Sequence, residues 1–535
     1  MFTPYKTMKT LSYTTATGVA TFSIVAALTS TAPGAPLRYT IPAGPNNTLL
    51  GSSIVALGDL NGDGIRDFAV GDPGYAASAP DSSLIAGSGK VLVVSGINGA
   101  IIRELLGTPA SGQAFGTSLA SLDANGDGVS DIAVGATGGN GTVWVYSGVD
   151  GTVLQAITAP SPGSGSLFGQ ALANAGDQNA DGKDDLFAGA PGADTLAGKV
   201  LVLSGADGAL ILEFTPGVQN AEFGYSLATV ADLSADGRLD VVVGAPGYSS
   251  GVGSLRLMSS AGVEIAGIDG TVAAARLGSR VGVVDDRNAD AVADIIVGSG
   301  SGGGAFLVSG TSLAVISDLS IAGAAGLPVV AGGSVDVNLD GVTEMLVGYP
   351  GAAPLPRVSV VPAPAAPEPN VYEAAAAGSG LGSAIAVVPG LGFAIGEPLA
   401  NGGAVYLYST LPDSDGDGVA DVDDHCPDSI LDPTVIFGDI NTGVENRVNA
   451  EGCSIADQFA ELMPASGWRN HGKFVSSSVK LVKRLLREGE INAEEAQALR
   501  SGAAQSNIGK PVKPAKPVKP TKPTKPEKPS KPTRP

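Results

Sequence analysis

The chain of 535 residues contains only two histidines and two cysteines. Both histidines, His425 and His471, lie beyond the long repeated body of the chain. That body therefore cannot supply a histidine-based catalytic triad or a histidine zinc site. An exported protein could pair its two cysteines, Cys426 and Cys453, in a disulfide.

Aromatic residues make up only 5% of the chain, whereas glycine is very frequent. Short Val, Ile, Leu and Ala runs are separated by turn residues, which favours many short strands over long helices. The formal net charge is −21, so nucleic acid is not an expected partner of the main body.

Long apolar runs are absent except near the N-terminus. Lys6 and Lys9 precede an apolar stretch at residues 19–28, and small residues follow through Ala35. This pattern predicts a signal peptide over residues 1–35, too short to span a membrane. The alternative is a disordered tail with a chance apolar run. We expect a protein that is secreted or held at the cell surface.

A nine-residue acidic motif recurs along the body. The copy at Asp123 reads D-A-N-G-D-G-V-S-D, and we name the six copies acidic loops 1 to 6, beginning at Asp59, Asp123, Asp177, Asp232, Asp286 and Asp336. A period of about 55 residues is typical of propeller blades and solenoid units. Oxygen ligands at positions one, three, five and nine, with glycine at six and a carbonyl at seven, suit Ca²⁺ better than Mg²⁺.

The predicted ligands are the side chains at positions one, three, five and nine and the carbonyl oxygen at position seven. In loops 1 and 2 they are Asp59, Asn61, Asp63, Ile65 and Asp67, and Asp123, Asn125, Asp127, Val129 and Asp131. In loops 3 and 4 they are Asp177, Asn179, Asp181, Lys183 and Asp185, and Asp232, Ser234, Asp236, Arg238 and Asp240. In loops 5 and 6 they are Asp286, Asn288, Asp290 and Asp294, and Asp336, Asn338, Asp340 and Glu344.

The alternative interpretation is that Asp-Gly and Asn-Gly pairs merely form hairpin turns. Close carboxylates without a cation would repel one another by about 4 kcal/mol per pair at an effective dielectric near 20, which favours calcium. Loop 5 has Ala291 in place of glycine and loop 6 ends on Glu344, so both are weaker candidates. A seventh unit, marked by Leu381-Gly382 and residues 393–396, has no carboxylate between these segments and is predicted to be metal-free.

Each unit reads as four short strands. In the first unit they are expected at residues 53–57, 68–71, 91–95 and 101–105, with the acidic loop between the first two. The third strand recurs at residues 143–147, 200–204, 305–309 and 405–409. Seven four-stranded antiparallel blades are predicted.

The units resemble the FG-GAP repeats of the integrin α-subunit propeller. The resemblance rests on Phe-Gly at Phe115, Phe168 and Phe223 and on Gly-Ala-Pro-Gly at Gly189 and Gly244. It implies an all-β, seven-bladed β-propeller over residues 36–411, with calcium between the first two strands of a blade. The seventh unit stops after Tyr408 while residues 37–41 form a spare strand, so we expect these ends to pair and remove open edges.

The segment D-S-D-G-D-G-V-A-D-V-D-D-H-C-P from Asp413 resembles a thrombospondin type 3 calcium repeat, and it implies a connector over residues 412–453. The implied ligands are Asp413, Asp415, Asp417, Asp421 and Asp424 with the carbonyl oxygen of Val419. The resemblance also implies a disulfide between Cys426 and Cys453. His425 is expected to face solvent.

Residues 454–508 are predicted to be a small helical region. Val475, Val479, Val482 and Leu486 recur at helical spacing with basic residues between them, and Asn492 with Glu495 is typical of a helix cap. A helical pair folding on itself is favoured over a membrane-surface or partner helix. The Lys/Pro-rich tail, residues 509–535, is predicted to be disordered and extended; it either binds an anionic wall polymer or only aids solubility.

No enzyme is expected. Matches to a nucleophile elbow, around Ser118 and Ser226, recur at the same place in successive units and are therefore structural. The leading hypothesis is an exported calcium-binding adhesion or ligand-binding module for an extracellular protein or polysaccharide. The alternatives are a carbohydrate-active lyase or glycosidase and a structural surface-layer component. Tyr75, Tyr248 and Tyr349 are the aromatic candidates for ligand contact.

Overall fold

The computed structural model forms two compact units, Met1–Leu411 and Pro412–Pro535. It describes the chain except for residues 1–13, 16–17, 20–28, 31–34, 36, 45, 47, 79–83, 108–109, 111, 160–164, 301–303, 321–328, 338–341, 353–354, 362–369, 411–424, 427–428, 431, 450–452, 465–467, 509 and 511–535. Most of the predicted signal peptide lies outside the described residues, as do the predicted calcium ligands of residues 412–424 and nearly all of the Lys/Pro-rich tail.

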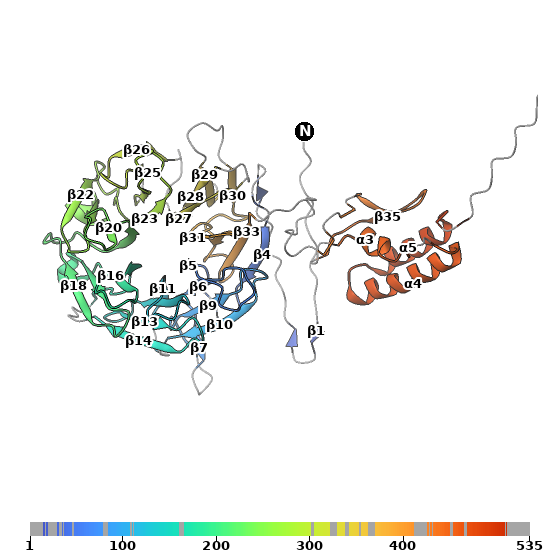
Figure 1. Ribbon diagram of the computed structural model, residues 1–535, viewed down its shortest axis with the longest axis horizontal. Helices are drawn as coiled ribbons and strands as arrows, with labels where there is room; N and C mark the ends of the chain where they lie inside the picture. The colour runs from blue at the N-terminus through green and yellow to red at the C-terminus, as the bar shows by residue number, and fades with distance from the viewer. Residues whose placement is uncertain are drawn as a thin grey trace, which may run out of the picture. The chain divides into compact units, whose positions relative to one another are not determined.

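The first unit is a ring of seven four-stranded antiparallel blades (Figure 1). Blades 1 and 2 are β5 (Ser53–Ala56), β6 (Phe68–Asp72), β9 (Lys90–Val94), β10 (Ile101–Leu106), and β11 (Phe115–Leu122), β12 (Asp131–Ala136), β13 (Thr142–Tyr146), β14 (Val153–Thr158). Blades 3 and 4 are β15 (Leu172–Gly176), β16 (Asp185–Ala190), β17 (Lys199–Leu203), β18 (Leu210–Phe214), and β19 (Ser226–Val230), β20 (Asp240–Ala245), β21 (Ser254–Met258), β22 (Glu264–Asp269).

Blades 5 and 6 are β23 (Arg280–Val284), β24 (Asp294–Gly298), β25 (Ala305–Val308), β26 (Val315–Asp318), and β27 (Val329–Val335), β28 (Glu344–Tyr349), β29 (Arg357–Val361), β30 (Asn370–Glu373). Blade 7 is β31 (Ala384–Val388), β32 (Gly392–Gly396), β33 (Ala404–Ser409) and β4 (Leu37–Pro42). The smaller elements are β1 (Thr14–Thr15), β2 (Gly18–Val19), β3 (Thr29–Ser30), β7 (Ala77–Ser78), β8 (Leu84–Ile85), α1 (Ala193–Leu196) and α2 (Tyr248–Gly251). The predicted blades, their number and their strand order are confirmed.

Strand β4 closes the ring from the N-terminal side. It lies antiparallel to β33, with Ile41 opposite Val405, and Figure 1 shows the blue strand beside the last strands of the propeller. It also reaches blade 1, because Tyr39 Oη donates to the Ser95 carbonyl at 2.8 Å and Arg38 Nη2 donates to the Ile97 carbonyl at 2.7 Å. The expected pairing of the two ends is confirmed.

The Phe-Gly segments and the Gly-Ala segments that end the second strands hold neighbouring blades together. Gly135 on β12 faces the next blade so closely that a Cβ atom there would lie 2.1 Å from the Gly169 carbonyl oxygen. Ser118 Oγ donates to that same oxygen at 2.6 Å, and Ser226 Oγ donates to the Gly278 carbonyl at 2.7 Å. These serines therefore have structural partners, as expected from their repetition.

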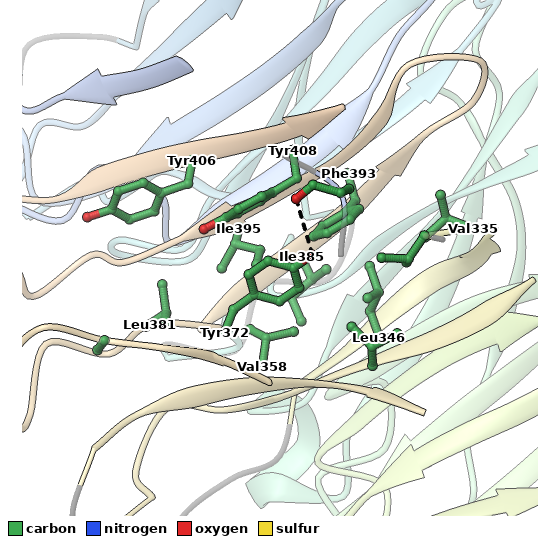
Figure 2. Close-up of a cluster of buried hydrophobic side chains, with 14 of the residues drawn as sticks. Val335, Leu346, Val358, Tyr372, Leu381, Ile385, Phe393, Ile395, Tyr406 and Tyr408 are labelled. Carbon is green, nitrogen blue, oxygen red and sulfur yellow. Dashed lines mark hydrogen bonds between the residues drawn. The ribbon is translucent and has the colours of Figure 1, made fainter. Parts of the chain in front are cut away.

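The core of the propeller lies between adjacent blades. Figure 2 shows the contact between blades 6 and 7, where Tyr372 of β30 packs against Phe393 and Tyr408 of blade 7. The Tyr372 ring lies 5.6 Å from the Phe393 ring and 4.5 Å from the Tyr408 ring, centroid to centroid. Buried aromatic pairs of this kind are worth about 0.5–1.5 kcal/mol beyond the area that they bury.

The second unit contains β34 (Thr434–Phe437), β35 (Ile440–Glu445), α3 (Ile455–Ala460), α4 (His471–Glu488) and α5 (Ala493–Gln505). The hairpin β34–β35, which the sequence analysis did not anticipate, contributes Phe437 to the helical core. The buried face of α4 is rotated from the predicted one: Leu481 and Leu485 are buried, whereas Leu486 is 37% exposed.

Other predictions for this unit are confirmed. Cys426 and Cys453 form a disulfide, and His425 is exposed. Asn492 and Glu495 form a capping box at the start of α5. Across the described parts of the chain, none of the helices combines the length and apolar character that a bilayer-spanning segment requires.

An ion pair joins the segment that follows β35 to α5. The Arg447 guanidinium donates to both Glu495 carboxylate oxygens at 2.9 Å, and its Nη2 also donates to the Glu490 carbonyl at 2.8 Å. Hydrogen bonding from Arg447 holds the pKa of Glu495 below its ordinary value, although partial burial opposes this. The ion pair therefore stabilises the fold at pH values above the ordinary pKa of a glutamate side chain.

Ile41→Ala should lower the free energy of unfolding by about 2–4 kcal/mol, because Ile41 is buried on the closing strand. The measurement is urea unfolding of the full chain. Ile101→Ala is the matched control: Ile101 also lies on an outermost strand but is 51% exposed, so its change should stay within about 0.5 kcal/mol. Equal effects of the two substitutions would contradict the closure by β4.

Glu495→Gln should destabilise the second unit by about 1 kcal/mol at pH 7, and this difference from the wild type should shrink as the pH falls through and below 4.5, the ordinary glutamate value. The sign follows because a lowered carboxyl pKa gives stability that protonation removes. Urea unfolding can be followed by Trp468 fluorescence in a Trp144→Phe background. The neighbouring exposed Glu494→Gln is the control, and a difference that stays constant down to pH 3 would reject the ion pair.

Candidate metal sites

Each of acidic loops 1 to 5 connects the first two strands of its blade, and its ninth residue is a buried carboxylate with two backbone partners. In loop 2, Asp131 accepts hydrogen bonds from the N–H of Ala124 at 3.0 Å and of Gly148 at 2.9 Å. The same two bonds recur at Asp67, Asp185, Asp240 and Asp294. This carboxylate therefore joins the start of the acidic loop to the end of the third strand.

The first, third and fifth side chains organise the loop backbone. Asp123 Oδ1 accepts from the N–H of Gly126 at 2.8 Å, and Asp123 Oδ2 accepts from the N–H of Gly128 at 2.9 Å. Asn125 Oδ1 accepts from the N–H of Asp127 at 2.8 Å. Each of these side chains therefore turns back onto its own loop and fixes the loop backbone.

Loop 4 brings its carboxylates closest to one another. One oxygen from each of Asp232, Asp236 and Asp240 lies within 4.8 Å of the others. Ser234, the third-position residue, donates from Oγ to Asp240 Oδ1 at 3.2 Å. The predicted side-chain ligands of this loop thus form one cluster of hard oxygens.

The clusters concentrate negative charge. Burial raises the pKa of Asp131 to about 6, and the charges of Asp127 and Asp123 add to this increase. Burial likewise raises the pKa of Asp67, Asp185 and Asp294, again with a contribution from acids of the same loop. Among the described residues, no carboxylate of loops 1 to 5 forms an ion pair with lysine or arginine.

The loops need left-handed backbone at two positions. The sixth residue has φ of +87° at Gly64 and +81° at Gly128, and Ala291 of loop 5 adopts φ of +68° at the same place. Ala291 still donates from its N–H to Asp286 Oδ2 at 2.7 Å, so loop 5 keeps the arrangement despite the strain. Position four is also left-handed, a requirement that the sequence analysis missed because Ala180, Ala235 and Ala289 occupy it.

Serines at the ends of third strands complete the loops. Ser95 Oγ donates to Asp63 Oδ2 at 3.1 Å, and Ser309 Oγ donates to Asp290 Oδ2 at 3.3 Å. In blade 4 the fifth-position acid, Asp236, instead accepts from Ser260, which lies one residue further along the chain than the serines of the other two blades. The sequence signal for the contacts of Ser95 and Ser309 was the serine that ends the third strand in these units.

The remaining predicted ligands are less completely described. In loop 6, Glu344 is buried and accepts from the N–H of Val337 at 2.8 Å, whereas Asn338 and Asp340 lie outside the described residues. Asp413, Asp415, Asp417, Val419, Asp421 and Asp424 of the connector also lie outside them. Blade 7 has a short turn between β31 and β32, in which Leu391 is fully buried.

One aromatic candidate for ligand contact is wrong. Tyr349 is only 4% exposed, and its hydroxyl donates to the Leu319 carbonyl at 2.8 Å, so it belongs to the core. Tyr75 and Tyr248 are half-buried, with the Lys90 Nζ 4.4 Å and the Arg256 guanidinium 5.2 Å from their respective ring centroids.

Comparison with known proteins adds a family signal. The FG-GAP repeat model matches residues 115–146, 168–203 and 223–258, which correspond to blades 2, 3 and 4. The chain is 32% identical over 149 residues to integrin alpha-4 of Xenopus laevis, an alignment covering 25% of this chain and 14% of the relative. It is 31% identical over 232 residues to integrin alpha-V of Gallus gallus, covering 39% and 21%.

Human integrin alpha-IIb is 38% identical over 157 residues, covering 27% of this chain and 15% of the relative. The chain thus spans at most about a fifth of the length of these relatives. Together with the seven blades, the three matched repeats support an integrin-like FG-GAP β-propeller.

Ala291→Gly should stabilise the protein by about 1 kcal/mol, because glycine adopts the left-handed conformation of position six without strain. Gly128→Ala should destabilise it by a similar amount, since no atom lies within 4 Å of a Cβ added there and only the backbone conformation is penalised. Urea unfolding of both variants at one fixed calcium concentration measures the difference. If both substitutions changed the free energy of unfolding in the same direction, position six would not have the same backbone conformation in loops 2 and 5.

Proposed function

We propose that this integrin-like FG-GAP β-propeller is an exported, non-catalytic adhesion or ligand-binding module whose acidic loops hold calcium. The supporting observation is the shared hydrogen bonding of loops 1 to 5, in which the first-position acid binds the loop backbone and the ninth-position acid is buried, together with the cluster of three carboxylates in loop 4. Oxygen-only donors and the absence of ion-pairing cations among the described residues of these loops suit Ca²⁺. The residues present therefore fit this ion.

The residues that would hold calcium are the predicted ligand sets of the six loops. A bound ion would neutralise carboxylates that otherwise repel one another. The chain's own contribution is to fix those oxygens in advance. In loops 1 to 5 the ninth residue is anchored by two backbone N–H groups, and the first residue by the backbone N–H groups of positions five and six. Loop 6 would do the same with Glu344, and the connector with Asp413 and its neighbours.

The adhesive role is supported by the similarity to integrin alpha chains. The chain's serines that resemble elbow nucleophiles donate their hydroxyls to backbone carbonyls, and its clustered acids are committed to the loops. A carbohydrate-active enzyme is therefore less well supported than a binding module. The ligand would be an extracellular protein or polysaccharide, and Tyr75 and Tyr248 are the aromatic residues that we would test for contact with it.

We further propose the division of the chain that its sequence indicates. Residues 1–35 would direct export, residues 412–453 would form a calcium-bound connector, and residues 454–508 a small helical region. The Lys/Pro tail would bind an anionic wall polymer through its regularly spaced lysines. A structural surface-layer role is the remaining alternative.

Removal of calcium should destabilise the propeller strongly. An ion present at about 100 times its Kd stabilises a folded protein by about 2.7 kcal/mol, and several ions act together here. Calorimetry of chelated and calcium-loaded protein should give a large decrease in Tm, and elemental analysis should find several calcium ions per chain. Magnesium at the same concentration is the control. Equal melting of both forms, with no calcium recovered, would reject the metal sites.

Ligand binding can be tested on glycan and extracellular-matrix peptide arrays with and without chelator. Selective, calcium-dependent binding without turnover is the expected result. Hydrolysis or lyase cleavage of a bound polysaccharide would instead support the enzyme, and self-assembly without ligand binding would support a surface-layer component. Tyr75→Ala and Tyr248→Ala should reduce binding if these rings contact the ligand, whereas the buried Tyr349 is not expected to contact it.

A further inference from the structure

Acidic loops 2 and 3 are joined through the eighth residue of loop 3. Asp184 Oδ2 accepts a hydrogen bond from the backbone N–H of Asp123 at 2.9 Å, and the Asp184 N–H donates to the Asp123 carbonyl oxygen at 2.9 Å. Asp123 is the first residue of loop 2. Asp184 lies between Lys183 and Asp185, both predicted ligands of loop 3. One residue thus contacts the ligand sets of two neighbouring sites.

The position of Asp184 is fixed by its own blade. Asn174 Nδ2 donates to Asp184 Oδ2 at 2.8 Å and to the Ser121 carbonyl of blade 2 at 3.2 Å. Asn174 Oδ1 in turn accepts from the N–H of Gly176 at 2.7 Å. Asp184 is therefore part of a hydrogen-bonded network that crosses the boundary between blades 2 and 3.

A second contact links the same loops through their ninth-position acids. Gly205 donates from its N–H to Asp185 Oδ1 at 3.0 Å, and a Cβ atom on Gly205 would lie 3.2 Å from the Cα of Ala124 in loop 2. The start of loop 2 thus packs on the residue that anchors the last ligand of loop 3. A displacement in one loop is therefore transmitted to the other through directly packed residues.

At two other blade boundaries the eighth residue is not a carboxylate. Between loops 1 and 2, the eighth residue is Ser130, whose Oγ accepts from the N–H of Gly58 at 3.1 Å. Between loops 4 and 5 the eighth residue is Ala293, which has no side-chain acceptor. The boundary between loops 4 and 5 is therefore a natural comparison that lacks the carboxylate.

We propose that Asp184 couples calcium binding in loop 2 to calcium binding in loop 3, acting as a positioning residue for Asp123. The inference rests on the proposed calcium function. An ion held by the carbonyl oxygen of Lys183 and the carboxylate of Asp185 would fix the segment that carries Asp184. Asp184 would then fix Asp123 through the two hydrogen bonds between them. Loop 2 is thus ordered before its own ion arrives, so its affinity rises. Linkage requires loop 2 to raise the affinity of loop 3 by the same factor.

Hydrogen–deuterium exchange of the full chain, read by mass spectrometry across a series of buffered calcium concentrations, reports each loop separately. Loop 3 is disabled by the double substitution Asp177→Asn and Asp181→Asn, which keeps one acceptor oxygen on each side chain for the loop's backbone N–H groups. The calcium midpoint for protection of the peptide covering residues 123–131 should then move upward by at least about fivefold. Disabling loop 2 with Asp123→Asn and Asp127→Asn should move the loop 3 midpoint by the same factor.

Asp184→Ala should remove this coupling, so that disabling loop 3 no longer moves the loop 2 midpoint. Asp184→Asn keeps an oxygen acceptor for the Asp123 N–H and should retain part of it. A merely structural role would destabilise both loops without abolishing their mutual dependence. In the matched control, disabling loop 5 with Asp286→Asn and Asp290→Asn should leave the loop 4 midpoint unchanged within about twofold.

The results that would overturn the proposal are specific. Calcium protection of both loops with independent midpoints in the wild type would reject the coupling while leaving the calcium function intact. Coupling that survives Asp184→Ala would show that another contact carries it. No calcium-dependent protection in any acidic loop would instead reject the proposed function, and the coupling would fall with it.

Discussion

The proposed metal sites of the propeller depend on the hydrogen bonds of the buried ninth-position carboxylate. In loops 1 to 5, one oxygen of this buried acid accepts from the start of the loop and the other from the end of the third strand. A buried charge of this kind is tolerated only when it is fully hydrogen-bonded or meets an opposite charge. The acid thus joins three strands of a blade and also completes the oxygen cluster, so fold and proposed metal binding depend on one side chain.

Much of the fold was predictable from the sequence because the determining signals are local and repeated. Strand limits follow from short apolar runs between glycines, and the position of the acidic loops follows from fixed offsets between Asp, Asn and Gly. The closure by β4 was predictable because one unit lacked a strand and another segment was spare. Each of these inferences needs only chain order and periodicity.

The features that were not predicted depend on contacts between segments that lie far apart in the sequence. Tyr349 looked like a loop aromatic, but its burial depends on the neighbouring blade boundary. The α4 face was misjudged because its core also receives Phe437 from a hairpin that only tertiary packing stabilises. Asp184 carried no motif signal, since its partner is a backbone N–H in another blade. Alanine at position four hid a left-handed requirement that glycine would have revealed.

The closing strand has a consequence for how the chain reaches its native state. Blade 7 takes β4 from the beginning of the propeller and its other three strands from the end, so this sheet cannot form until nearly the whole propeller sequence has emerged. Pairing between such distant segments is slow because the loop entropy must be overcome first. Until then β4 has no partner strand, and a chaperone that shields nascent chains would have its greatest effect on this late intermediate.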